Sequence, residues 1–77
     1  MSDIDQDIAA RLDSMGVVPL IGGLIPEKAT AELLGYSPAY MRQQASRGLA
    51  PLPYVLRGNR RFYRVRDIRA FALNCAG

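Results

Sequence analysis

The sequence predicts a small α+β domain that is mostly helical, and three observations predict it. Two short helical stretches, at residues 26–34 and 38–47, are separated by a turn at Gly35. Residues 54–63 carry β-branched and aromatic side chains on both sides of a two-residue, glycine-containing loop, which is typical of a β-hairpin. A further amphipathic helical stretch follows at residues 65–74.

The turn Gly35-Tyr36-Ser37-Pro38 determines where one helix ends and the next begins. Gly35 can adopt the left-handed backbone conformation that closes a helix. Ser37 can cap the following helix through its side-chain oxygen, and Pro38 suits the first helical turn, where no backbone N–H is needed. Two short helices joined by a glycine-containing turn are typical of a helix-turn-helix.

The predicted hairpin is centred on Gly58-Asn59. A two-residue loop places three pairs of residues opposite each other: Arg57 with Arg60, Val55 with Phe62, and Leu56 with Arg61. Like charges directly opposite each other destabilise a sheet. The arginine-rich tip is therefore unfavourable unless an anion lies nearby.

An additional segment, residues 1–23, precedes these elements. We expect a helix over residues 1–15, in which Ser2 followed by Asp5 resembles a capping box. One face of this helix carries a narrow apolar stripe, formed by Ile4, Ile8, Leu12 and Met15. The narrow stripe favours a peripheral or dimerising role, so residues 1–23 are interpreted as a helix and apolar linker that serve packing or oligomerisation. The alternatives are a frayed tail at the N-terminus and, for residues 17–25, a short strand that leads into the next helix.

The charge of the chain is divided between its halves. Residues 1–37 carry six acids and two bases, a charge of −4, and residues 38–77 carry eight arginines against Asp67, a charge of +7; together they give +3. The planar guanidinium group suits phosphates and guanine edges. The second half is therefore predicted to bind nucleic acid, and the alternative is an ordinary solvated basic surface.

Other classes of function lack the residues they need. With one cysteine and no histidine, neither an intramolecular disulfide nor a zinc site is expected. No nucleophile has a plausible base, so we predict no enzyme, no catalytic residue, no metal and no cofactor. The apolar run at residues 17–25 contains a proline and two glycines and is far shorter than the ~20 residues of a membrane span. We expect a cytoplasmic protein that does not enter the membrane.

The second helix of the helix-turn-helix has one apolar side and one polar side. Met41 and Ala45 lie one turn apart and are predicted to face inward. The remaining positions point outward or lie on the flanks: Ala39, Tyr40, Arg42, Gln43, Ser46 and Arg47. Glutamine suits adenine, and arginine suits guanine or phosphate. This face is either a base-reading surface or an ordinary polar one.

Taken in order, these elements resemble the winged helix-turn-helix of the MerR-like and excisionase (recombination directionality factor) family. The resemblance covers residue 24 to about residue 73. It is carried by Ala31-Glu32-Leu33-Leu34-Gly35-Tyr36-Ser37-Pro38, by Arg42, Gly48 and Pro51, and by Gly58-Asn59-Arg60-Arg61-Phe62, Asp67, Ile68 and Phe71. It implies that residues 24–77 form a winged helix-turn-helix DNA-binding domain with a two-stranded wing, and that the N-terminal helix is an addition.

In that family the second helix enters the major groove, and the wing lies along the adjacent phosphates or the minor groove. Carried over, the resemblance implies helix contacts by Ser37, Tyr40, Arg42, Gln43 and Arg47, and wing contacts by Arg57, Asn59, Arg60 and Arg61. The bulky aromatic residue common late in the family's second helix is Gln44 here, so the helix is expected to seat differently.

The resemblance also implies a role. Small members of the family are typically excisionases of phages or mobile elements, so it implies a sequence-specific, architectural DNA-binding protein that also regulates transcription. The implied partners are double-stranded DNA, a site-specific recombinase and further copies of the protein on DNA, with a nucleoid-associated location in the cytoplasm. The alternatives are a small prophage- or plasmid-type transcriptional regulator and a protein-interaction module such as an anti-repressor.

Overall fold

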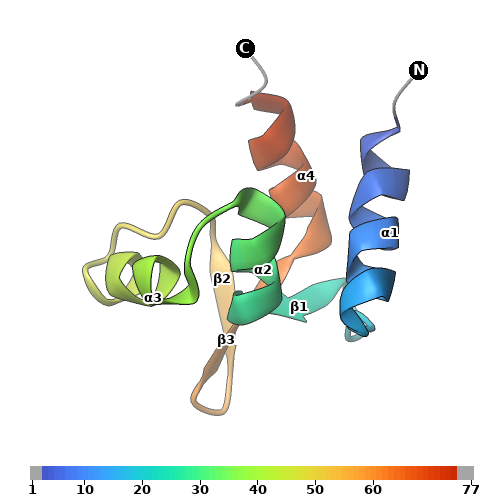
Figure 1. Cartoon of the computed structure of the whole chain (residues 1–77). Coiled ribbons are helices and arrows are strands. Elements are labelled where there is room, and N and C mark those ends of the chain that lie inside the picture. The colour runs from blue at the N-terminus through green and yellow to red at the C-terminus, as the bar shows by residue number, and fades with distance from the viewer. Residues whose placement is uncertain (1–2, 75–77) are drawn as a thin grey trace.

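The computed structural model describes residues 3–74 and shows a small, mostly helical α+β fold of the winged-helix type (Figure 1). The elements are α1 (Ile4–Met15), β1 (Leu24–Pro26), α2 (Glu27–Leu34), α3 (Pro38–Ser46), β2 (Tyr54–Arg57), β3 (Arg60–Arg64) and α4 (Val65–Asn74). The strands form an antiparallel sheet in the order β1-β3-β2. In Figure 1 the β2–β3 hairpin extends downward, away from α4, and α3 lies on the opposite side of α2 from α1.

The helix-turn-helix forms as its turn residues predict. Gly35 is in the left-handed region with φ 82°, and the Tyr36 N–H donates to the Ala31 carbonyl over 2.9 Å, which closes α2. The Ser37 hydroxyl oxygen accepts a hydrogen bond from the Tyr40 N–H over 3.1 Å and caps α3. Both helices are slightly shorter than expected, because Pro26 belongs to β1 and Arg47 is the C-cap of α3.

The hairpin register is confirmed, but the sheet has a third strand. Arg57 lies opposite Arg60 across the Gly58-Asn59 turn, as predicted. The expected two-stranded wing is present as the β2–β3 hairpin, and the end of the apolar stretch 17–25 adds a strand that pairs with β3 and places Ile25 opposite Tyr63. Both of these side chains are fully buried, so the third strand brings the wing into the core.

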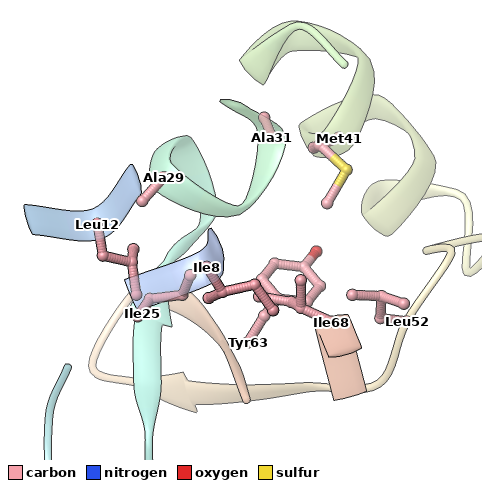
Figure 2. Close-up of a cluster of buried hydrophobic side chains, with 9 residues drawn as sticks. All are labelled: Ile8, Leu12, Ile25, Ala29, Ala31, Met41, Leu52, Tyr63 and Ile68. Atoms are coloured by element: carbon pink, nitrogen blue, oxygen red, sulfur yellow. The ribbon is translucent and has the colours of Figure 1, made fainter. Parts of the chain in front are cut away.

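Helix α1 is part of the same core (Figure 2). Ile8 and Leu12 are buried in one cluster with Met41, Tyr63 and Ile68. Ile4 and Met15 pack against that cluster. Of the two roles expected for this segment, packing or oligomerisation, the structure shows packing, because α2 and α4 contact α1 and its stripe lies against the core.

The N-terminus of α1 is capped by a residue that the sequence interpretation did not choose. The side chain of Asp3 accepts a hydrogen bond from the Asp5 N–H over 3.0 Å. Ser2, which was expected to start the capping box, lies outside the described residues. Asp5 is also tied to the body of the protein, because Arg69 on α4 approaches its carboxylate to 2.9 Å.

The burial of α1 gives a test of its role. Leu12→Ala is expected to lower the free energy of unfolding by ~2–5 kcal/mol, because it leaves a cavity in a core that has little room to collapse. Chemical denaturation followed by circular dichroism measures the loss, with the exposed neighbour Asp13→Ala as control. A Leu12→Ala protein as stable as the control would show that α1 lies outside the cooperative core.

Candidate nucleic-acid interface

A cleft opens where the N-terminus of α2, the middle of α3 and the tip of the hairpin meet. Seven residues line it: Pro26, Glu27, Lys28, Arg42, Asn59, Arg60 and Arg61. Four of the seven are bases and only Glu27 is an acid. We call this the basic cleft. It forms because α2 begins directly after β1, and β1 pairs with the strand that leads back from the hairpin tip.

One side of α3 is free for contacts. Met41 and Ala45 are buried and attach the helix to the core, while Arg42, Gln43 and Arg47 are exposed. Within residues 3–74, the side chains of these three have no hydrogen-bond or ion-pair partner. This exposure agrees with the outward orientation predicted for Gln43 and Arg47 and with the flanking position predicted for Arg42, and the donors of all three are available to a ligand.

Two of the predicted contact residues also have structural roles at the start of α3. The Ser37 oxygen caps the helix, which leaves its hydroxyl proton and one lone pair to offer to a partner. The Tyr40 ring lies 4.9 Å from the Tyr36 ring in a tilted arrangement, and it is still partly exposed. Aromatic packing of this kind holds the Tyr40 hydroxyl in a defined position at the edge of the exposed face.

The hairpin tip carries charge that the protein does not neutralise. Arg57, Asn59 and Arg60 are exposed, and the two arginines face each other across the strands. No carboxylate of the described residues pairs with either arginine. The Arg60 guanidinium lies 5.9 Å from the centre of the Phe62 ring, which orients it without cancelling its charge. An anion bound here would relieve the repulsion.

Arg61 behaves differently from the other predicted wing residues. Its Nε donates to the Glu27 carboxylate over 2.8 Å, and its side chain is only 23% exposed. This hydrogen bond is the main reason that the pKa of Arg61 is raised. The anion beside Arg61 is therefore Glu27, which leaves Arg61 fewer free donors than the other wing arginines; its contact with DNA stays a prediction. Sequence inspection missed the pair because the partners are 34 residues apart.

Lys28 joins the site although the sequence interpretation gave it no role. It is exposed in the first turn of α2 and lines the basic cleft with Arg42 and Arg60. No local signal marks it, since a lysine near a helix N-terminus is usually an ordinary surface residue. Only the pairing of β1 with β3 brings it next to the hairpin.

The remaining ion pairs concentrate the positive charge on this face. Three arginines outside the basic cleft have carboxylate partners: Arg11 with Asp7 at 2.8 Å, Arg64 with Asp67 at 3.8 Å, and Arg69 with Asp5 at 2.9 Å. Acids of the first half of the chain thus neutralise bases on α1 and α4. The described bases without a carboxylate partner are Lys28, Arg42, Arg47, Arg57, Arg60 and Arg66, and all but Arg66 lie on α2, α3, the hairpin or their flanks.

Two features of other classes of protein are missing from residues 3–74. None of the four helices is both long and apolar enough to cross a bilayer. No three side chains of the metal-binding types gather in this part of the chain.

Comparison of the chain with models of protein families, with curated proteins and with solved structures finds no match.

Proposed function

We propose that this protein binds double-stranded DNA, with α3 in the major groove and the β2–β3 hairpin on the adjacent sugar-phosphate backbone. The observation that supports this most is the basic cleft, in which cations from α2, α3 and the hairpin meet without enough acid to neutralise them. A B-DNA major groove is about 12 Å wide and admits a single helix. The exposed side of α3 supplies the hydrogen-bonding groups that such a groove can use.

Several features favour DNA over an acidic protein partner. Gln43 and Arg47 belong to the residue types that bind base edges in a bidentate way, and both are exposed, Gln43 on α3 and Arg47 at its C-cap. The opposed arginines of the hairpin tip suit the closely spaced phosphates of a duplex. A model in which the acidic N-terminus covers the basic face has no support, because Asp5 and Asp7 pair with arginines on α4 and α1.

The finer role that we propose is architectural: the protein bends DNA to direct excision by a site-specific recombinase, and it also regulates nearby transcription. A single module of this size covers only ~600–1,000 Å² of protein surface on DNA. Bending a site costs on the order of several kcal/mol, which favours several copies on neighbouring sites. With the α1 stripe buried, the segment after α1 still offers exposed apolar surface for self-association, since Val18 is 83% exposed and Ile21 is 98% exposed.

The hairpin tip gives an electrostatic test. Arg57→Ala and Arg60→Ala are each expected to weaken binding to all duplex sequences alike. Each should reduce the slope of log K against log salt by ~0.9, the value for one lost phosphate contact. Fluorescence anisotropy at several salt concentrations measures both effects. Arg11→Ala removes the same charge from α1 and should leave the slope unchanged; equal slopes for all four proteins would remove the hairpin from the interface.

The exposed side of α3 gives a test of base reading. Gln43→Ala and Arg47→Ala should each lose ~1–3 kcal/mol of discrimination at one or two base pairs, because a direct base contact is removed. Selection from a randomised duplex library measures the preference of each variant, with the exposed Gln6→Ala on α1 as control. If the Gln43 and Arg47 variants keep the preferences of the wild type, α3 is not the reading element.

The architectural role predicts cooperative binding and bending. The wild type should occupy repeated sites cooperatively and slow the fragment in a bend-sensitive gel assay. Replacing Val18 and Ile21 together with serine should reduce cooperativity and leave single-site affinity unchanged, because these exposed side chains make little contribution to the core. Non-cooperative binding of one unbent site by the wild type would favour the simpler transcriptional regulator.

A further inference from the structure

We propose that Glu27 is a positioning residue that holds the wing in the orientation needed for DNA binding, an inference that rests on the proposed function. Glu27 is the first residue of α2, so it lies where the helix-turn-helix meets the sheet. It also lines the basic cleft, although its charge is opposite to that of the bases around it. A carboxylate repels a phosphate, so Glu27 must have a role in this cleft other than direct contact with the DNA backbone.

The carboxylate of Glu27 binds two side chains of β3 at once. Its Oε2 accepts from Arg61 Nε over 2.8 Å and from the Tyr63 hydroxyl over 3.1 Å, and its Oε1 accepts from an Arg61 terminal nitrogen over 3.4 Å. Residues two apart on a strand point to the same face. One acid on α2 therefore accepts hydrogen bonds from two neighbouring side chains, Arg61 and Tyr63, on the same face of β3.

The surroundings make this network stronger than a surface ion pair. The side chains of Glu27 and Arg61 are 17% and 23% exposed, and Tyr63 is fully buried. Burial, followed by the charge of Glu27, raises the pKa of the Tyr63 hydroxyl, so this group stays protonated and remains a donor. Charge-assisted hydrogen bonds in such a partly buried place are held more firmly than exposed ones.

The network is located where the hairpin leaves the body of the protein. The last pair between β1 and β3 joins Pro26 to Phe62, so the part of the hairpin from Leu56 to Arg61 extends beyond β1. Arg61 is the first residue past that limit, and the Glu27 pair ties it back to α2. Its guanidinium also lies 5.8 Å from the Tyr54 ring, which links β2 to the same point.

The two possible effects of Glu27 on DNA binding have opposite signs. If only its charge mattered, removing it would strengthen binding, because one negative group would leave a surface that attracts phosphates. If it positions the wing, removing it would weaken binding, because Arg57 and Arg60 would lose their fixed place relative to α3. The sign of the change therefore decides between electrostatics alone and positioning.

The variant Glu27→Gln tests this, because it keeps the size of the side chain and removes the charge. We expect a loss of about tenfold in affinity for duplex DNA, the size expected for one charge-assisted hydrogen bond. In the free protein, amide hydrogen exchange should become faster in the hairpin and stay unchanged in α1 and α4. The matched control is Glu32→Gln, which removes the same charge from an exposed position on the same helix.

Two further variants strengthen the test. If Glu27 acts through Arg61, then the double variant Glu27→Gln/Arg61→Ala should bind no more weakly than Arg61→Ala alone. Tyr63→Phe keeps the buried ring and removes only the hydroxyl that donates to Glu27, so it replaces Glu27→Gln as the test if that variant is partly unfolded. We expect it to lower the affinity for duplex DNA as well, but by less than Glu27→Gln does. Unchanged or tighter binding by Glu27→Gln, with hairpin exchange like that of the wild type, would overturn the positioning role.

The two levels of the proposal fail in different ways. A wild-type protein without affinity for duplex DNA would reject the proposed function. Hydrogen exchange in the free protein would still show whether Glu27 holds the hairpin. A wild type that binds DNA and a Glu27→Gln variant that binds equally well would instead retain the function and reject the inference.

Discussion

The pairing of β1 with β3 is the constraint on which the rest of the structure depends. Strand β1 is only three residues long, but α2 begins directly after it, and α4 begins directly after β3. The Val65 N–H also donates to the Gly23 carbonyl over 2.8 Å, which joins the start of α4 to the start of β1. One short ladder thus fixes two helices and the hairpin relative to one another. The basic cleft and the Glu27 network both exist because of this arrangement.

What the sequence could predict follows from the range of each interaction. Gly35, Ser37 and the Gly58-Asn59 turn act on their immediate neighbours, and the helix ends and hairpin register that they predict are found. The third strand and the burial of α1 depend on segments far apart in the chain, so no local pattern could show them. A narrow apolar stripe resembles a dimerisation surface until the position of α4 is known.

The candidate site likewise contains residues that a local pattern predicts and residues that only tertiary contacts bring into it. Exposure of Arg42, Gln43 and Arg47 follows from helical periodicity around two buried residues, and the structure agrees. The role of Arg61 does not follow from its neighbours: the repulsion at the hairpin tip indicated a nearby anion, but only the tertiary structure shows that Glu27 is the anion for one of the arginines. Lys28 entered the site for the same tertiary reason.

The distribution of stability also fits a binding role. The largest buried side chains come from β1, β3, α3 and α4, and α1 covers the same core, so the scaffold does not depend on the hairpin tip. Opposed arginines and an exposed polar helix face make little contribution to folding. A protein can carry them only if its core supplies enough stability without them. In this protein the acids of the first half are used on α1 and α4, where they pair with Arg11 and Arg69. The positive charge left on α3 and the hairpin is thus a consequence of how the core and its ion pairs are built, and that excess charge is what a nucleic acid can bind.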